Sequence, residues 1–282
     1  MNKKVVVFGG TGILGSALVD TLLKKSEFIV SVLSRKISPN TQFIRYYQGD
    51  ILNSESITQA VRENDIIINC TGQITKPIGQ CLQANTLGML NLARLVEKYH
   101  KFILHVSTVN VYGSAENVDE NSPMQPETVY AALKACSENI VTSLIPSERY
   151  CIVRLSNLYG SLKSKGILSL LLSSIATNKT INIDNDGSLL RFFLHVNDAA
   201  SILATLLANN IHGIVNLPGN EMFTIRSLVE IIEKHAKKKI PVVYENRQPH
   251  SNIRAIDCNN IAAHGKLEYQ YSVESYILSI FG

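Results

Sequence analysis

Tyr130 and Lys134 are two residues whose types and spacing suit proton transfer. On a helix, residues i and i+4 lie on one face, which places the Lys134 ammonium beside the Tyr130 phenol. A free tyrosine has a pKa of about 10, and a nearby cation favours the phenolate and lowers that value. Such a phenol can exchange a proton with a hydroxyl or carbonyl oxygen. The pair predicts acid–base chemistry at an oxygen atom.

The spacing alone does not decide this, because a chain with 11 tyrosines produces it by chance. It occurs again at Tyr159 and Lys163, but a Gly-Ser pair lies between those two and is typical of a loop. Tyr130 instead follows a predicted strand, residues 102–107, that ends in hydroxyl side chains. Thr108 could hydrogen-bond the same oxygen as Tyr130 and fix its position. The strand with its hydroxyl side chains and the Tyr130–Lys134 pair together support proton transfer more strongly than the spacing of the pair alone.

A Gly-x-x-Gly-x-x-Gly loop follows a β-branched run, residues 5–8, at the start of the chain. Gly9 lets the chain turn off the strand, Gly12 lets backbone N–H groups approach a pyrophosphate, and Gly15 lets the next helix pack close to the sheet. The predicted helix, residues 16–25, adds a partial positive charge at its N-terminus. This context predicts a dinucleotide site, with a glycine turn that binds nothing as the alternative.

The elements that position these residues alternate between apolar runs and helical patterns, which indicates βαβ units around a parallel sheet. The predicted strands are residues 5–8, 28–33, 43–47, 66–70, 102–107, 150–155 and 214–217. The clearest helices are residues 80–99, 127–143 and 196–208. The strand predicted at residues 214–217 comes late in the chain and returns to the sheet. We therefore expect the substrate lobe to consist of an inserted segment and the C-terminal segment, and not to be a separate domain.

The segment Ser34-Arg35-Lys36 follows the second predicted strand and contains no carboxylate. NAD-binding folds place an acidic residue here for the ribose 2′-hydroxyl, whereas two cations suit the 2′-phosphate of NADP. A basic surface turn is the alternative. Asp50, after the third strand, could accept hydrogen bonds from an adenine amino group or could cap the next helix.

Small residues end the fourth predicted strand, at Cys70, Thr71 and Gly72. They leave room for a cofactor that crosses the sheet edge, although they also suit a plain turn. Asn85 stands in an otherwise apolar helical pattern. A buried asparagine must be hydrogen-bonded, so we expect it to bond backbone or a neighbouring strand.

Composition describes an ordinary globule: 282 residues, 45% hydrophobic, 18% charged and a net charge of +4. The scattered basic residues and the short run 237–239, interpreted as a solvated helix end, do not predict nucleic-acid binding. Five cysteines without metal-ligand spacing suit free thiols and a cytoplasmic protein without a bound metal. We expect no signal peptide and no membrane segment.

Taken together, these motifs resemble the extended short-chain dehydrogenase/reductase family of nucleotide-sugar epimerases, dehydratases and reductases, from residue 3 to about residue 265. The marks are the glycine loop, Gly49-Asp50-Ile51, Asn85-Thr86-Leu87-Gly88, Ser107-Thr108 with Val111-Tyr112-Gly113, Tyr130 with Lys134, Arg154-Leu155-Ser156-Asn157-Leu158-Tyr159-Gly160, and Arg191-Phe192-Phe193-Leu194-His195-Val196-Asn197-Asp198.

The resemblance implies an α/β fold: a Rossmann-type doubly wound parallel sheet with a small C-terminal substrate-binding lobe. The dinucleotide-binding domain would be residues 1–160, with 192–220 returning to the sheet, and the lobe would be 161–191 and 221–282. It also implies a homodimer built from the helices around 85–99 and 127–143, although sheet packing would equally explain apolar faces on these helices.

By the same resemblance Thr108, Tyr130 and Lys134 are the catalytic set, and Lys134 also holds the nicotinamide ribose. Asn157 would contact substrate, and Arg191 would grip a sugar-nucleotide diphosphate, although read alone it could be a surface arginine. His195 is interpreted as structural. The candidate dinucleotide contacts are Gly9, Thr11, Gly12, Ile13, Leu14, Gly15, Ser34, Arg35, Lys36, Asp50, Ile51, Cys70, Thr71, Gly72, Asn85, Ser107, Tyr130 and Lys134. The candidate substrate contacts are Gln73, Thr108, Val109, Asn110, Asn157, Arg191 and Arg247.

Several residues depart from the family pattern. Phe192 stands where the family has Asp, Ser161 replaces a proline, and Val109 and Asn110 replace the Asp–Glu pair of the 4,6-dehydratases. The expected function is therefore an NADP-dependent reductase of a nucleotide-linked 4-keto-6-deoxy sugar. The alternatives are an NAD-dependent C4-epimerase and a non-enzymatic dinucleotide sensor, which would have no reason to keep the Thr–Tyr–Lys set.

Overall fold

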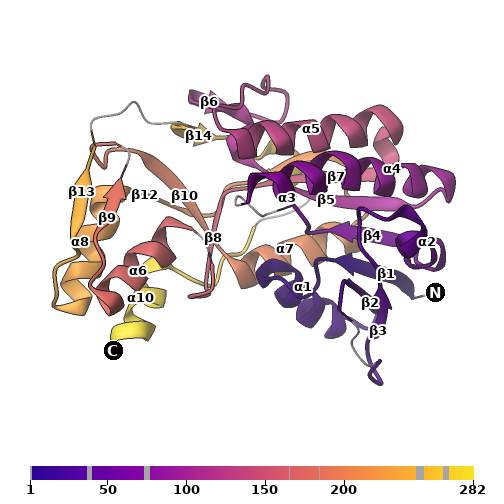
Figure 1. The fold of residues 1–282 in the computed structure, drawn as a ribbon, viewed down its shortest axis with the longest axis horizontal. Helices are drawn as coiled ribbons and strands as arrows, with labels where there is room; N and C mark the ends of the chain where they lie inside the picture. Colours follow the sequence, from indigo (N-terminus) through magenta and orange to yellow (C-terminus); the bar gives the residue numbers. More distant parts are fainter. Residues whose placement is uncertain are drawn as a thin grey trace.

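A parallel sheet of seven strands forms the centre of the described chain (Figure 1). The computed structural model describes residues 2–36, 40–72, 77–164, 166–183, 185–245, 251–262 and 267–282. In spatial order, from one sheet edge to the other, the strands are β11 (Gly213–Leu217), β7 (Tyr150–Leu155), β5 (Phe102–Thr108), β4 (Ile66–Asn69), β1 (Lys3–Phe8), β2 (Phe28–Ser34) and β3 (Arg45–Gln48). All neighbouring pairs are parallel.

These are the seven predicted strands, so the prediction of a parallel α/β sheet is confirmed. The third begins at Arg45 instead of residue 43, because Thr41 closes a turn with Ile44 before pairing starts. The order of the strands reverses between β1 and β4. Doubly wound sheets bind ligands at the carboxyl ends of the two strands beside such a reversal.

Helices cover both faces of the sheet, because alternate side chains of the buried strands point to opposite sides. The helices are α1 (Ile13–Leu23), α2 (Ser54–Glu63), α3 (Ile78–Gln83), a π-helical turn (Ala84–Gly88), α4 (Met89–Lys98), α5 (Val129–Leu144) and α7 (Val196–Ala208). Val5 and Val7 of β1 pack on one face with α1 and α7, whereas Val6 and Phe8 pack on the other with α2, α4 and α5.

Three of these helices differ from the predicted ranges at their starts. The helix predicted over residues 16–25 is α1 and begins earlier, at Ile13, because Gly12 is its N-cap and the last glycine of the loop lies inside the helix. The predicted helix 80–99 is a continuous run of α3, the π-helical turn and α4. The helix predicted over 127–143 begins at Val129, because the Thr128 hydroxyl accepts a hydrogen bond from the Ala131 N–H and caps α5.

A second apolar core lies beyond one end of the sheet, on the left of Figure 1. Leu171, Leu228 and Ile277 come from three of its helices and are all fully buried. Its elements are β8 (Asn157–Tyr159), α6 (Ile167–Thr177), β9 (Ile181–Ile183), β10 (Leu190–His195), β12 (Glu221–Thr224), α8 (Ile225–Ala236), β13 (Val242–Tyr244) and α10 (Val273–Phe281).

The segment 253–262 packs on the sheet side of the molecule, although it lies within the range 221–282 expected for the lobe. β14 (Ile253–Ile256) pairs with β6 (Ala115–Val118), and α9 (Asn259–Ala262) contacts β11. Two 3₁₀ turns, Val109–Tyr112 and Ser147–Arg149, complete the described elements.

Candidate active site

The glycine loop after β1 makes the first wall of the candidate site. Gly9 has φ +78°, and a Cβ at Gly15 would lie 2.1 Å from the Gly9 carbonyl oxygen, so both positions require glycine. Gly12 is the N-cap of α1, with no side-chain cap and no acidic residue in the first turn. The first N–H groups of a helix have no intrahelical partner. At Ile13 and Leu14 they suit an anion such as a pyrophosphate.

The end of β4 makes the second wall and lies against this loop. The Cys70 N–H donates to the Phe8 carbonyl at 3.0 Å, and a Cβ at Gly9 would meet the Cys70 carbonyl group at 3.1 Å. Gly72 has φ +81°, and a Cβ there would lie 2.4 Å from the Asn85 side chain. The two predicted segments therefore meet at the point where the strand order reverses.

The Asn85 side chain supports this second wall by hydrogen bonds to backbone carbonyl groups. Its Nδ2 donates to the carbonyl oxygens of Gly72 and Cys81, both at 3.0 Å, while Thr71 beside them is partly exposed. This confirms the expectation that the buried amide bonds backbone. The π-helical turn that carries it holds the 70–72 segment in place, and π-helical turns recur at functional sites.

The residues after β2 and β3 border the same edge of the sheet. Ser34 is buried and its hydroxyl accepts from the Lys36 N–H at 3.2 Å, while the side chains of Arg35 and Lys36 are exposed. The Asp50 carboxylate accepts from the Leu52 N–H at 3.0 Å. Asn53, not Asp50, caps α2, so the helix-cap alternative for Asp50 is wrong. Ile51 is buried against Gly88.

The two hydroxyls at the end of β5 differ in their partners. Ser107 is 1% exposed, and its hydroxyl donates to Glu138. The Thr108 oxygen accepts from the Asn110 N–H at 3.3 Å, which leaves its own hydrogen to donate elsewhere. Of the two hydroxyls, only that of Thr108 therefore keeps a hydrogen for a further partner.

Tyr130 and Lys134 lie one turn apart on α5, near its N-terminus. Tyr130 is partly exposed, whereas Lys134 is completely buried and donates from Nζ to the Val106 carbonyl of β5 at 2.6 Å. Burial lowers the pKa of Lys134 to about 8, against the opposing effect of Glu138. Its ammonium is thus anchored to the strand that carries Thr108.

A buried polar network behind these residues was not predicted from the sequence. Arg154 of β7 donates to the Glu138 carboxylate at 2.7 and 3.1 Å and to the Tyr112 hydroxyl at 2.7 Å. Tyr112 in turn donates to the Asn216 side chain at 2.7 Å. Arg154 and Glu138 are 3% and 1% exposed, so the pair ties α5 to the sheet in a dry environment. The feature of the sequence that could have indicated this network is Arg154, a charged residue inside the apolar run 150–155.

The comparisons with known proteins agree with this geometry. The sequence profile of the NAD dependent epimerase/dehydratase family matches residues 5–217, well over half of the chain. The chain belongs to this family. The match begins in β1 and ends at the last residue of β11, so it spans the whole central sheet.

Curated relatives of this family member are similar over most of their length. A Methanocaldococcus jannaschii protein, provisionally named UDP-glucose 4-epimerase, is 26% identical over 86% of this chain and 85% of its own. Mouse dTDP-D-glucose 4,6-dehydratase is 27% identical over 89% of this chain and 80% of its own. The Thermus thermophilus UDP-glucose 4-epimerase in complex with NAD has the same fold, with a TM-score of 0.82, 22% identity and coverage of 98% and 96%.

Asn157 and Arg191, which were predicted to bind substrate, both contact backbone in this family member. Asn157 donates to the Phe192 carbonyl at 3.0 Å, and Arg191 donates to the Ser251 carbonyl at 2.5 Å. Burial lowers the pKa of Arg191 to about 10, against the opposing effect of Glu127. Val109 is buried, Asn110 is partly exposed, and Gln73 and Arg247 lie outside the described residues.

His195 caps a helix, which agrees with its structural interpretation. Its Nδ1 accepts from the Asn197 N–H at 3.2 Å at the start of α7, and its ring stacks on Tyr271 at 3.8 Å. A Cβ at Gly160 would lie 2.5 Å from the imidazole. The histidine is therefore enclosed by packing.

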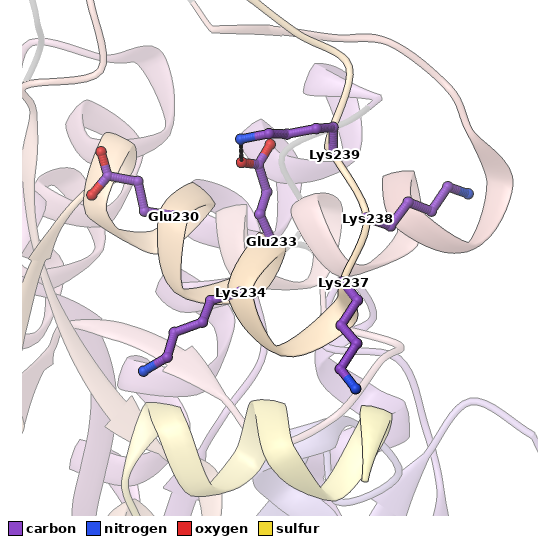
Figure 2. A pocket seen from close by; sticks show the side chains of 6 residues that line it. All are labelled: Glu230, Glu233, Lys234, Lys237, Lys238 and Lys239. Carbon is purple, nitrogen blue, oxygen red and sulfur yellow. Dashed lines mark hydrogen bonds and ion pairs between the residues drawn. The ribbon is translucent and has the colours of Figure 1, made fainter.

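A hollow of about 410 Å³ lies on the lobe of this family member, and no residue of the glycine loop lines it (Figure 2). The run 237–239 follows the C-terminus of α8 there, which agrees with its interpretation as a helix end. In Figure 2 Lys239 turns to Glu233, and the other lysines extend in different directions. These solvated charges do not converge on a point.

None of the described helices is long and apolar enough to cross a membrane. No group of three or more His, Cys, Asp or Glu side chains in the described ranges is arranged to hold a metal ion.

Proposed function

We propose that this chain is an NADP-dependent reductase of a nucleotide-linked 4-keto-6-deoxy sugar. One observation carries the proposal: the anchored Lys134, the partly exposed Tyr130 one turn before it and the Thr108 hydroxyl gather at the carboxyl edge of the sheet. That edge also carries the loop built around Gly9, at the reversal of strand order.

The residues present fit a dinucleotide. The loop has no room for side chains at Gly9 or Gly15, and the N-terminus of α1 has no cap from a side chain. Both features suit a pyrophosphate held by backbone N–H groups. The exposed cations Arg35 and Lys36, at the end of β2, suit a ribose 2′-phosphate and therefore NADP.

The chemistry follows from three side chains. A bound dinucleotide would supply the hydride that reduces the ketone carbon. Tyr130 donates its phenolic proton to the ketone oxygen, which becomes a hydroxyl, and the phenolate regains a proton from water. Lys134 stabilises the phenolate by its charge, and the Thr108 hydroxyl donates to the same oxygen and orients it.

The proposed substrate class rests on the relatives and on the lobe. The curated relatives carry the names of UDP- and dTDP-sugar enzymes. The guanidinium of Arg191 extends from β10 to the Ser251 carbonyl. A planar guanidinium can donate two parallel hydrogen bonds, which suits a diphosphate. We propose that it exchanges its carbonyl contact for the diphosphate of the substrate.

A dehydratase is not favoured. Its chemistry needs an acid and a base beside the sugar ring, directly after the hydroxyl residue. Val109 is buried and apolar, and the Asn110 amide does not exchange a proton in that way. The site therefore offers Thr108, Tyr130 and Lys134, which suffice for a reductase, without the added acid and base that a dehydratase needs.

A C4-epimerase is the second candidate, and the relatives favour it. The M. jannaschii relative and the T. thermophilus structural neighbour both carry 4-epimerase names, and the neighbour holds NAD. An epimerase would use Tyr130, Lys134 and Thr108 on a substrate hydroxyl and ketone in turn. It would retain its dinucleotide through each cycle.

Titration of the purified protein with NADPH and NADH, followed by nicotinamide fluorescence, separates the two candidates. Exchangeable binding that prefers NADPH supports the reductase and justifies assays with nucleotide-linked 4-keto sugars. Tightly retained NAD, released only on denaturation, would overturn the reductase and support the epimerase.

Reversing the charge at Arg35 tests the NADP assignment directly. We expect Arg35→Glu to weaken NADPH binding at least about tenfold and NADH binding little, since a hydrogen bond to a charged group contributes about 1.5–3 kcal/mol. Lys179→Glu, an equal charge change at an exposed residue of the lobe, is the control. Equal losses for both dinucleotides would contradict the assignment.

A further inference from the structure

His105 is a buried histidine that the proposed chemistry does not use. It lies on β5 and is 1% exposed. Its Nδ1 is 3.2 Å from Nδ2 of Asn69 at the end of β4, and its Nε2 is 2.9 Å from Oγ of Ser137 on α5. Nε2 also lies 3.4 Å from Nζ of Lys134. The imidazole thus touches the one ammonium on which the proposed function depends.

The contact with Asn69 decides which ring nitrogen accepts. The Asn69 oxygen accepts from the Thr71 N–H at 3.1 Å and from the Thr71 hydroxyl at 2.6 Å. Its NH₂ group must therefore face His105. Because an amide NH₂ only donates, Nδ1 of His105 accepts and carries no hydrogen.

The contact with Ser137 gives the same answer independently. The Ser137 hydroxyl donates its single hydrogen to the Lys134 carbonyl at 2.7 Å. Its oxygen is then an acceptor toward His105, so Nε2 carries the hydrogen. Both neighbours require the neutral, Nε2-protonated imidazole. Burial, followed by the charge of Lys134, holds the pKa of His105 well below its ordinary value.

The fixed tautomer has a consequence for Lys134. Nε2 already carries a hydrogen, and an ammonium only donates, so the 3.4 Å contact is not a hydrogen bond. The imidazole limits where Nζ can lie and keeps it on the Val106 carbonyl, 2.6 Å away. Since the Nδ1 lone pair is taken by Asn69, the ring does not relay a proton.

We propose that His105 is a positioning residue for Lys134: a neutral imidazole, locked between Asn69 and Ser137, that keeps the ammonium on the Val106 carbonyl. The proposal rests on the proposed function in that Lys134 is taken to act on Tyr130. The other titratable groups near Lys134 are Glu138 on α5, Cys81 on α3 and Cys70 after β4.

Nitrogen-15 NMR of the full chain tests the locked imidazole without any reaction. In protein labelled at its seven histidines, the signals missing from His105→Gln identify this residue. We expect one neutral, Nε2-protonated ring from pH 5.5 to 9. A ring that titrates in this range, or that carries its hydrogen on Nδ1, would overturn the proposal.

Two substitutions then test the effect on Lys134. His105→Phe fills the volume without either hydrogen bond, and His105→Gln keeps a donor within reach of Ser137. We expect Phe to lower kcat about tenfold, an effect of the size of one lost hydrogen bond. The KM of the nucleotide sugar and the Kd of NADPH should change less than about twofold, because neither is expected to contact His105. Gln should recover most of the loss.

The pH profile separates positioning from plain stability. Lys134 must hold its proton to act, so kcat falls as pH rises through its pKa, and burial sets that pKa at about 8. Without the imidazole, Nζ is held less closely on the Val106 carbonyl that accepts its hydrogen bond, so His105→Phe should move this alkaline limb to lower pH. A lower Tm with an unchanged limb and unchanged kcat would overturn positioning.

The outcomes also separate this proposal from the proposed function. If the wild-type protein reduces no nucleotide-linked ketone, the proposed function fails, and the NMR result still decides the state of His105. If the enzyme is active but His105 titrates, only the positioning proposal fails. Should His105→Phe not fold, Ser137→Ala removes the same Nε2–H acceptor and should lower kcat by a similar factor.

Discussion

At the scale of single residues, the candidate site depends on a charge placed where water is absent. Lys134 is completely buried, and its Nζ has the Val106 carbonyl at 2.6 Å and Glu138 one turn further along α5. Keeping an ammonium in such a place is unfavourable for folding. The chain retains it beside Tyr130, which is what a catalytic role predicts.

Replacing Lys134 with methionine should therefore stabilise the dinucleotide-free protein at pH 7. The pKa falls from an ordinary value of 10.5 to about 8, which corresponds to a cost on the order of 3 kcal/mol. Between pH 8 and 10.5 the unfolded chain binds a proton that the folded chain does not, so the wild type gains relative stability as pH rises through this window. Urea unfolding of both proteins at pH 7 and 10 measures the difference. A variant that is less stable at pH 7, or a difference that does not shrink at pH 10, would contradict the argument.

Tyr130→Phe removes one hydroxyl and tests the proton donor. We expect kcat to fall by about 10²–10⁴-fold, the usual contribution of a positioned acid, with the Kd of NADPH changed less than about twofold. Steady-state rates and fluorescence titration measure the two quantities. Turnover that persists within about fivefold of wild type would remove Tyr130 from the mechanism, and absence of turnover in the wild type would favour a dinucleotide sensor.

At the scale of elements, α5 and the glycine loop bring the parts of the site together. One face of α5 carries Lys134, Ser137 and Glu138, and each contacts β5, β7 or their side chains. The loop brings the N-terminus of α1 against the end of β4. The sheet and helices thus form a rigid frame, and the candidate catalytic and dinucleotide-binding residues lie at the ends of these elements.

Gly15→Ala tests that close approach. A Cβ at this position would lie 2.1 Å from the Gly9 carbonyl, so the loop must shift, and we expect lower stability and at least about tenfold weaker NADPH binding. Gly79→Ala in α3 is the matched control, because its Cβ meets nothing within 4 Å. Alanine is also the better helix former by about 1 kcal/mol, so the control should fold at least as well as wild type. Thermal unfolding and titration check both, and equal behaviour of the two variants would refute a tight loop.

At the scale of the whole molecule, exposed apolar side chains gather on neighbouring helices. Ile78 and Leu82 of α3, Leu87 of the π-helical turn and Val129 of α5 are each about half exposed or more, and α5 contacts both other segments. These elements lie on one side of the sheet (Figure 1). We propose that a second copy of the chain covers this face, as expected for a homodimer.

Leu82→Glu should disrupt such a dimer. We expect light scattering to report twice the mass of one chain for the wild type and the mass of one chain for the variant, because a carboxylate in an apolar interface is left unpaired. Leu170→Glu on α6 is the control, since Leu170 is 50% exposed and Leu82 is 49% exposed. A wild-type protein of single-chain mass would remove the proposal.

Local patterns in the sequence determined most of the frame. The seven runs that form the sheet, the helix 196–208 and the glycine loop are all visible because backbone propensity and hydrophobic period act over a few residues. The spacing of Tyr130 and Lys134 sets their common helix face for the same reason. The start of α5 was two residues off, because the choice of Thr128 as cap depends on the chain that precedes it.

Only the tertiary structure decided which distant groups share a buried partner. Nothing near Arg154 in sequence indicates that it pairs with Glu138, and nothing near His105 indicates that Asn69 and Ser137 hold its ring. β14 joins β6 across more than 130 residues in the same way. Such contacts depend on packing and on the need to satisfy every buried polar group, and both are properties of the folded chain as a whole.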